Sequence, residues 1–218
     1  SNMPFDVQVD LNAVYQEAKK YYANILMPYG MQAKKALDIV KGLELEMICP
    51  SHGIIWTKHI PDILNMYEKY CTQKPERAAC IVFDSMWHST EKMAHAVLEG
   101  FSRAGIPAKL YDLKVNHVSD IITDILTSDY VAVGSPPLNH QMLPTVAAFL
   151  CHMQGLAPKG RKGLAFGSYG WGGQSIPQVA ESLEGMGFEL VCQPLKQAYV
   201  PSEESLNSLE ETVFQAVK

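Results

Sequence analysis

Cysteine is scarce in this sequence, and no two cysteines stand at the spacing of a metal-binding or redox pair. The 218 residues include five cysteines, none of them in a Cys-x-x-Cys motif. An odd number of cysteines without such pairs argues against a disulfide framework and against a cysteine zinc site. We expect most of them to be small buried hydrophobic residues in a reducing cytoplasm, as the strand-like surroundings of Cys80 and Cys192 indicate.

An excess of basic residues and a long apolar segment are also missing. Lysine and arginine number 18 against 23 aspartates and glutamates, and the net charge of −5 argues against a dedicated nucleic-acid binder. No apolar run reaches the roughly 18 residues of a membrane span, and no charged-then-apolar leader opens the chain. We therefore expect a cytoplasmic protein without nucleic-acid or membrane partners, and we read Ser1-Asn2 ahead of Met3 as a remnant of cloning.

The apolar pattern changes near Lys74-Pro75, which divides the chain into a leader, residues 1–75, and a longer part, residues 76–218. The leader has helical periodicity and little strand signal, and it is too small to be a self-sufficient domain. Its first apolar stripe, called the leader stripe below, recurs at spacings of three and four residues: Leu11, Val14, Ala18, Tyr21 and Ile25. Further helices are predicted over residues 32–40 and 61–70, with Pro28 and Gly30 as punctuation after the first helix.

Strand and helix signals alternate strictly through the longer part of the chain. Strands are predicted over residues 78–83, 108–113, 129–134, 163–167 and 188–194. Helices are predicted over residues 90–102, 118–126, 144–153, 174–186 and 202–217. The strands at 78–83 and 129–134 are apolar almost throughout, as in strands buried on both faces. This alternation predicts an α/β fold with a doubly wound parallel sheet.

Ligands of such folds bind outside the carboxyl ends of the strands, so the loops after the first, third and fourth strands are the candidate site. The first loop places three hydroxyls, Ser85, Ser89 and Thr90, just before a helix, which favours an anion site. The loop has no P-loop lysine, so a monophosphate fits it better than a nucleoside triphosphate with magnesium. The alternative is that Ser89 or Thr90 simply caps the helix.

The other two loops suit a flat heterocycle. Two prolines stiffen the loop after the third strand, which then offers Asn139 and His140 as polar groups. The loop after the fourth strand surrounds Tyr169 and Trp171 with four glycines, which permit close approach of the backbone to a ligand. Trp171 could instead be a surface anchor or a core residue. A phosphate cradle beside two such loops indicates a flavin mononucleotide (FMN) site.

Three motifs carry a resemblance to a known family: residues 85–94 (SMWHSTEKMA), 134–139 (GSPPLN) and 167–171 (GSYGW). They resemble the flavodoxin-like superfamily and, more closely, the carboxyl-terminal part of flavodiiron proteins. Residues 21–25 (YYANI) and 48–53 (ICPSHG) look like the last stretch of that family's metallo-β-lactamase-like domain. The resemblance implies a five-stranded parallel sheet of order 2-1-3-4-5 preceded by a mostly helical leader.

The resemblance also implies which residues bind FMN. The loop that wraps the phosphate would consist of Ser85, Met86, Trp87, His88, Ser89 and Thr90. The residues that flank the isoalloxazine ring would be Pro136, Pro137, Leu138, Asn139, His140, Ser168, Tyr169, Gly170, Trp171 and Gly172. Two positions depart from the pattern: His88 stands where short-chain flavodoxins favour glycine, and Pro137 replaces an expected threonine.

The diiron half of that family is absent from the sequence. Flavodiiron proteins carry a His-x-Glu-x-Asp-His cluster, and of their metal ligands only His52 has a match here. A transition-metal site needs several convergent ligands, so we expect no metal. No Ser-His-Asp set is evident either, and we expect no catalytic residues. The interpretation is an FMN-binding electron-transfer protein, a truncated relative of flavodiiron proteins without their diiron site.

Three alternatives remain open. The protein could be an FMN-dependent NAD(P)H:acceptor reductase, although no Gly-x-Gly-x-x-Gly follows a strand. It could be the flavin subunit of a split flavodiiron oxygen or nitric-oxide reductase, or an interaction protein with a dead flavin site. The acidic surface suits a basic redox partner, rubredoxin-like or a reductase. The leader stripe is expected to fold back on the flavodoxin-like part or to be buried in a homodimer.

Overall fold

The computed structural model describes residues 4–218, and the chain forms two compact units, Ser1–Lys74 (unit 1) and Pro75–Lys218 (unit 2). Ser1-Asn2, interpreted above as a cloning remnant, lies outside the described residues. No helix of the described part of the chain is both long enough and apolar enough to span a membrane.

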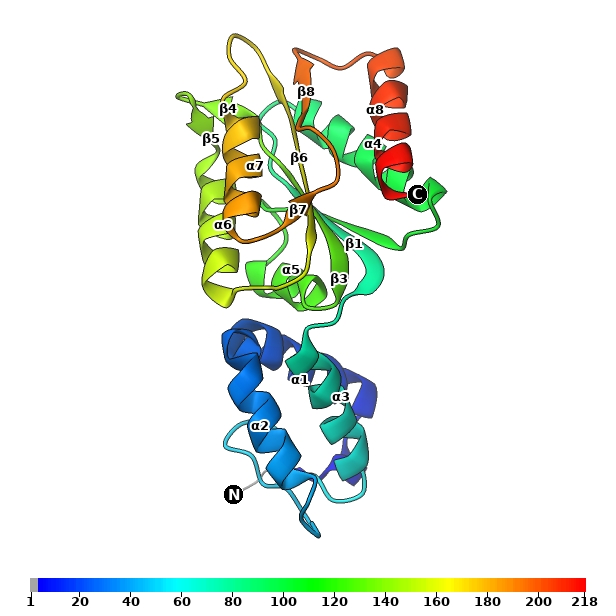
Figure 1. Ribbon diagram of the computed structural model, residues 1–218, viewed down its shortest axis with the longest axis vertical. Coiled ribbons are helices and arrows are strands. Elements are labelled where there is room, and N and C mark those ends of the chain that lie inside the picture. Colours follow the sequence, from blue (N-terminus) through cyan, green and yellow to red (C-terminus); the bar gives the residue numbers. More distant parts are fainter. Residues whose placement is uncertain (1–3) are drawn as a thin grey trace. The chain divides into compact units, whose positions relative to one another are not determined.

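Unit 2 is built on a parallel sheet of six strands (Figure 1). The strands are β1 (Glu76–Phe83), β2 (Ala108–Asp112), β3 (Ser128–Gly134), β6 (Lys162–Tyr169), β7 (Glu189–Leu190) and β8 (Leu195–Ala198). Their order is β2-β1-β3-β6-β7, and β8 also pairs with β6. This order confirms the predicted α/β fold. The chain first adds β2 on one side of β1 and then adds β3 on the other side, so the strand order changes direction at β1.

The prediction of one continuous last strand over residues 188–194 is wrong. Two short strands take its place, β7 beside the start of β6 and β8 beside its end. Between β7 and β8, the four residues 191–194 lie opposite only Leu164 and Ala165 of β6. The two strand segments therefore cannot stay in register. Pro194, which has no N–H to donate to a neighbouring strand, closes the interruption.

Helices α4 to α8 cover the two faces of the sheet (Figure 1). One face carries α4 (Ser89–Arg103) and α8 (Glu203–Val217), and the other carries α5 (Val118–Ile125), α6 (Pro144–Leu156) and α7 (Ser175–Gly185). Side chains of β1 facing α4 and α8, among them Ile81 and Phe83, form a buried cluster with Phe101 and Val213. The apolar run of β1 is therefore buried on both faces, as its sequence predicts, because Val82 is fully buried as well.

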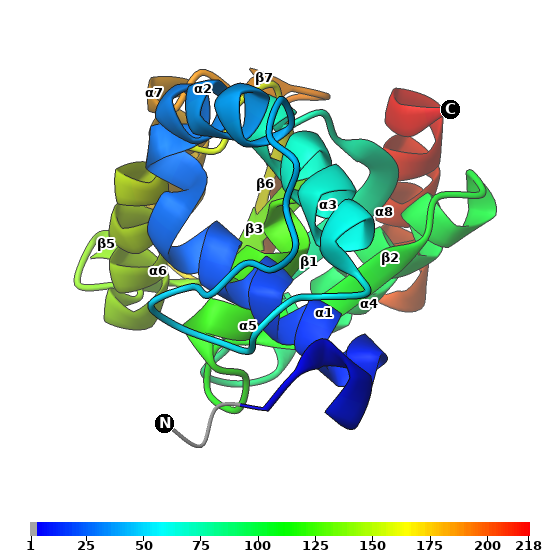
Figure 2. The same ribbon diagram turned by 90° about the horizontal axis from the view of Figure 1, so that it is seen from below.

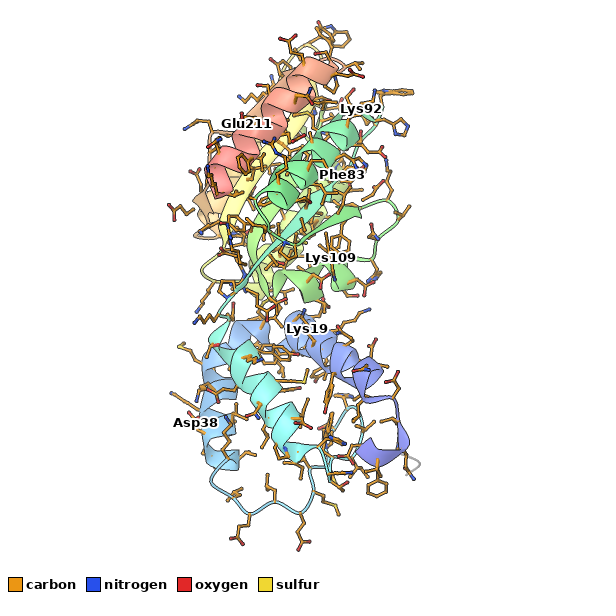
Figure 3. The ribbon with its side chains drawn as sticks, turned by 90° about the vertical axis from the view of Figure 1, so that its right-hand side faces the viewer. Lys19, Asp38, Phe83, Lys92, Lys109 and Glu211 are labelled. Atoms are coloured by element: carbon orange, nitrogen blue, oxygen red, sulfur yellow. The ribbon has the colours of Figure 1, made fainter. Side chains whose placement is uncertain are left out.

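Helices α4 and α8 lie side by side (Figure 3). Their close approach requires a glycine, because a Cβ at Gly100 would stand 2.7 Å from Cβ of Val213. Beyond this contact Arg103 donates hydrogen bonds of 2.6 and 2.9 Å to Glu210 and Glu211. These contacts join the carboxyl-terminal end of α4 to α8, and the candidate site lies at the opposite end of α4.

The described part of unit 1, from residue 4 onward, is mainly helical (Figure 2). Its α-helices are α1 (Leu11–Tyr21), α2 (Gly30–Val40) and α3 (Ile60–Thr72), and a short 3-10 turn, Asp6–Gln8, precedes them. The interruption expected at Pro28 and Gly30 is mild: a π-helical turn, Tyr22–Leu26, and a 3-10 turn, Met27–Tyr29, lead directly into α2. Pro28 is tolerated because it lies in the first turn of the 3-10 segment, where its missing N–H is not needed.

Part of the leader stripe packs inside unit 1. Leu11, Val14 and Ala18 lie against a small buried cluster that includes Trp56 and Ile63. The other two members of the stripe, Tyr21 and Ile25, are 38% and 52% exposed. Only the second half of the stripe is therefore free for a partner.

Candidate functional site

The three predicted loops meet at one groove at the carboxyl edge of the sheet, called the edge groove below. Its volume is about 250 Å³, and it is lined by Ser85, Met86, Trp87, Ser89, Pro136, Pro137, Ser168, Tyr169, Gly170, Tyr199 and Val200. Nine of these eleven lining residues are among the candidates from sequence. In Figure 3, Phe83 at the end of β1 and Lys92 in α4 mark the two elements that the first loop joins.

Seven other predicted residues do not line the edge groove: His88, Thr90, Leu138, Asn139, His140, Trp171 and Gly172. Two residues that do line it, Tyr199 and Val200, were missed from the sequence. They follow β8 directly, so they stand at the same edge as the other loops. They were missed because the expected strand ended at residue 194, four residues before the observed end of β8, so Tyr199 was not recognised as the residue after a strand.

The β1–α4 loop presents unpaired backbone donors. Within the described residues, the N–H groups of residues 86–91 donate to no protein group. His88 takes a left-handed conformation with φ of 62° and is the N-cap of α4, yet no side chain caps the helix. The alternative that Ser89 or Thr90 merely caps α4 is therefore wrong. Free N–H groups at a helix start, with its positive dipole end, suit an anion.

The hydroxyl groups of this loop have different roles. Ser85 and Ser89 line the edge groove, and their hydroxyls make no hydrogen bond within the described residues. Thr90 is fully buried and its hydroxyl lies 3.3 Å from that of Ser168, so it joins the β1 and β6 loops beneath the groove. The Ser168 N–H also donates to the Thr90 hydroxyl, at 3.3 Å. Two hydroxyls are thus open to a ligand, and the third is structural.

A buried carboxylate anchors the β1–α4 loop. Asp84 accepts hydrogen bonds of 2.6 Å from the Ser85 N–H and 2.5 Å from the Thr145 hydroxyl. Lys114 donates to the Ser85 carbonyl at 2.9 Å and stands 3.7 Å from Asp84. Thr145 of α6 and Lys114 of the β2–α5 connection thus hold the backbone around Ser85 in place. Binding of a ligand by Ser85 therefore costs little conformational entropy.

The exposed rim of the same loop carries an acid–base pair. His88 Nδ1 lies 2.6 Å from Glu91 Oε2. This hydrogen bond, more than any other cause, lowers the pKa of the Glu91 carboxyl. The carboxylate is therefore held toward His88, at the outer side of the first turn of α4.

The loop after β3 folds into a small hairpin of β4 (Pro137–Leu138) and β5 (Gln141–Met142). Asn139 and His140 form its two-residue turn, with φ of 50° and 62°, as a type I′ turn requires. The Gln178 side chain of α7 fastens the turn, because it donates to the His140 carbonyl and accepts from the Met142 N–H. Asn139 and His140 were expected to offer polar groups to a ring. In the structure they form the turn of the hairpin.

Ser135 joins this hairpin to the loop after β6. Its hydroxyl accepts from the Leu143 N–H at 2.9 Å, and its carbonyl accepts from the Ser175 hydroxyl at 2.9 Å. A Cβ at Gly167 would stand 2.2 Å from that carbonyl oxygen, so only glycine fits there. This close approach brings Pro136 and Tyr169 to one groove.

Two tryptophans at this edge are exposed. Trp87 is 85% exposed and Trp171 fully exposed, so Trp171 is not a core residue. Large apolar side chains left in water at the rim of a groove mark a surface for a ligand or partner.

The edge groove fits an FMN molecule in chemistry. Unpaired N–H groups and the Ser85 and Ser89 hydroxyls supply neutral donors for a phosphate. Prolines and aromatic side chains supply flat apolar walls for a ring. Among residues 4–218 no group of three or more His, Cys, Asp or Glu side chains is placed to hold a metal ion.

Comparison with known proteins agrees with this architecture. The flavodoxin family profile matches residues 81–212. The chain is 42% identical to the nitric oxide reductase of Moorella thermoacetica, over 89% of this chain and 49% of that protein. It is 39% identical to the rubredoxin-oxygen oxidoreductase of Megalodesulfovibrio gigas, over 98% of this chain and 55% of that protein.

Solved structures extend the similarity over the whole chain. The rubredoxin oxygen:oxidoreductase from Desulfovibrio gigas superposes with a TM-score of 0.94 at 38% identity, covering 100% of this chain and 55% of that one. The flavodiiron protein from Giardia intestinalis gives a TM-score of 0.94 at 26% identity, covering 100% and 54%. The chain spans about half the length of the curated relatives that it matches. It belongs to the flavodoxin family and is a relative of the flavodiiron proteins.

Proposed function

We propose that unit 2 binds FMN in the edge groove and serves in electron transfer. The observation that carries this proposal is the pairing of unsatisfied donors with an apolar groove. The N–H groups of residues 86–91 and the Ser85 and Ser89 hydroxyls have no partner among residues 4–218, and they stand where a parallel strand ends. Free N–H groups at a helix start, together with neighbouring hydroxyls, are the donors that an anion takes up in proteins.

Each wall of the groove has a separate task in this proposal. Ser85, Ser89 and the first turn of α4 hold the phosphate, while Pro136 and Tyr169 border the ring. The FMN supplies one- and two-electron redox chemistry when bound, and the protein supplies orientation, hydrogen bonds and exclusion of water. The exposed Trp87 and Trp171 give a redox partner direct access to this edge.

Titration with FMN, followed by visible absorption, tests the proposal. The wild-type chain is expected to bind, and Ser85→Ala to weaken binding by about 1.5–3 kcal/mol, as for a hydrogen bond to a charged group. Ser208→Ala, an exposed serine of α8 outside the groove, is the matched control and is expected to bind like the wild type. A wild-type chain that takes up no FMN at high micromolar concentration contradicts the proposal and favours an interaction protein with a dead flavin site.

The source of the electrons is also a proposal. A relative at 39% identity is named for rubredoxin, so we infer a rubredoxin-like protein as the partner. Reduced rubredoxin is expected to bleach the bound flavin, with one electron passed per encounter. Bleaching by NADH or NADPH alone would instead support the alternative of an NAD(P)H:acceptor reductase.

A second candidate function follows from unit 1, which we propose corresponds to the end of a metallo-β-lactamase-like domain. Several of its large apolar side chains are exposed, among them Met31 and Ile39. Its His52 lies against the ring of Tyr21. In a larger flavodiiron oxygen or nitric-oxide reductase, the rest of a metallo-β-lactamase-like domain would cover these exposed apolar side chains of unit 1. Purification together with a metallo-β-lactamase-like polypeptide tests this role.

A further inference from the structure

Tyr199 has a backbone conformation that its side chain disfavours. Its φ is 57°, in the left-handed region where bulky residues are uncommon. The conformation is fixed by a hydrogen bond of 2.7 Å from the Tyr199 N–H to the carbonyl of Tyr169. A glycine would adopt the same backbone without steric cost. A large aromatic at this position therefore lowers the stability of the fold.

The folded protein gains little from this side chain in return. Tyr199 is 64% exposed, and its hydroxyl makes no hydrogen bond within the described residues. A Cβ at Gly170 would stand 3.9 Å from Tyr199 Cε1, so the ring lies beside a position that carries no side chain. Neither core packing nor a polar contact explains why a tyrosine stands here.

The position of the ring supplies an explanation. Tyr199 and Val200 line the edge groove, in which Tyr169 and Pro136 also take part. Strained residues concentrate where a binding site needs a side chain in one place. Resting on the function proposed above, we propose that Tyr199 is a cofactor-contact residue whose ring forms the wall of the edge groove on the β8 side. It contacts the flavin ring rather than the phosphate, which the β1–α4 loop holds.

The key variant is Tyr199→Gly, which removes the ring and relieves the backbone strain together. Its apoprotein is expected to unfold at a higher temperature than the wild type, while its Kd for FMN rises about three- to tenfold, as for the loss of one aromatic contact. A residue with a merely structural role would not give these opposite changes. Tyr199→Phe keeps the ring and is expected to bind FMN like the wild type.

Two further variants separate the ring from the backbone. Ala157→Gly relieves a second left-handed residue, with φ of 50° at the end of α6 and outside the groove. It is expected to raise the unfolding temperature without changing FMN affinity. Tyr199→Asn tolerates the left-handed backbone but lacks an aromatic ring, and is expected to weaken binding as Tyr199→Gly does. Wild-type affinity in Tyr199→Asn would overturn the proposal.

Comparing FMN with riboflavin distinguishes this inference from the proposed function. Loss of Tyr199 is expected to weaken both ligands by the same factor, whereas Ser85→Ala is expected to weaken FMN alone. Unchanged affinity of Tyr199→Gly for both ligands, with a wild type that binds them, overturns the inference and leaves the proposed function intact. A wild type that binds neither ligand overturns both.

Discussion

Asp6 illustrates how single residues hold unit 1 together. It is almost completely buried, and its carboxylate accepts hydrogen bonds from the Thr57 hydroxyl at 2.7 Å and from the N–H groups of Thr57 and His59 at 2.9 and 2.7 Å. Burial by itself would raise the pKa of Asp6, but these three hydrogen bonds outweigh it and lower the pKa to about 2. The contacts tie the first residues of the chain to the segment before α3.

Asp6 should make the stability of unit 1 depend on acid pH. Because its pKa is lower in the folded state, its contribution is complete above about pH 4, the range of an unfolded aspartate, and is lost as the pH falls through 2. Asp6→Asn is expected to lower the free energy of unfolding at pH 7 by about 1.5–3 kcal/mol. Urea titrations at pH 7 and pH 2.5 measure this, and a deficit of equal size at both pH values would contradict it.

Gly167 lies where the backbone leaves no room for a side chain. A Cβ there would overlap the carbonyl oxygen of Ser135, so Gly167→Ala is expected to destabilise unit 2 by about 3 kcal/mol. Gly155→Ala in α6 is the control, because no atom lies within 4 Å of its Cβ position. It is expected to stabilise the helix by up to about 1 kcal/mol. Thermal unfolding of both variants checks the opposite signs.

The β4–β5 hairpin is an antiparallel insertion between β3 and α6 of the parallel sheet fold. Its type I′ turn matches the twist of antiparallel strands, and the Gln178 side chain holds it against α7. The hairpin thereby supports Pro137 at the edge groove while its turn points to water, since Asn139 and His140 are exposed.

The turn itself can be improved without touching the groove. His140→Gly creates the Asn-Gly pair that a type I′ turn favours, and is expected to stabilise the protein by about 0.4–1 kcal/mol. Since His140 does not line the edge groove, affinity for FMN is expected to stay within about twofold, less than the loss of one aromatic contact. Differential scanning calorimetry and FMN titration measure the two effects. A large loss of affinity would show that His140 contacts the cofactor after all.

The two units of the molecule have separate buried cores. Every residue that lines the edge groove belongs to unit 2. Unit 1 has a small core and carries exposed apolar side chains, including Tyr21 and Ile25 of the leader stripe. We therefore assign cofactor binding to one unit and association with another polypeptide to the other.

This division predicts how a fragment behaves. Residues 75–218 alone are expected to fold and to bind FMN as tightly as the full chain, because no groove residue is removed. Circular dichroism establishes folding, and titration compares the two affinities. A folded fragment with a much higher Kd would mean that unit 1 contributes to the site.

The same fragment tests the proposed homodimer. Light scattering at micromolar concentration is expected to give a dimer for the full chain and a monomer for residues 75–218, because the exposed half of the leader stripe lies in unit 1. A full chain that remains monomeric would contradict pairing through the leader stripe.

Most of the helices and strands, and the edge of the sheet that carries the candidate site, could be predicted from patterns along the chain. Apolar runs such as residues 78–83 and helical stripes such as that of residues 90–102 depend on neighbours along the chain, so their patterns are visible without a structure. The hydroxyls and aromatic residues placed after strands indicated the groove because parallel strands end at one edge.

The contacts that those residues make depend on parts of the chain that lie far apart in the sequence. Thr90 meets Ser168 across 78 positions of sequence, so its hydroxyl is turned into the protein. The interruption between β7 and β8 brings Tyr199 to the groove. The four residues 191–194 lie opposite only two residues of β6, so β8 pairs with the end of β6. Such long-range contacts depend on strand register and close packing, which no local pattern of residues encodes.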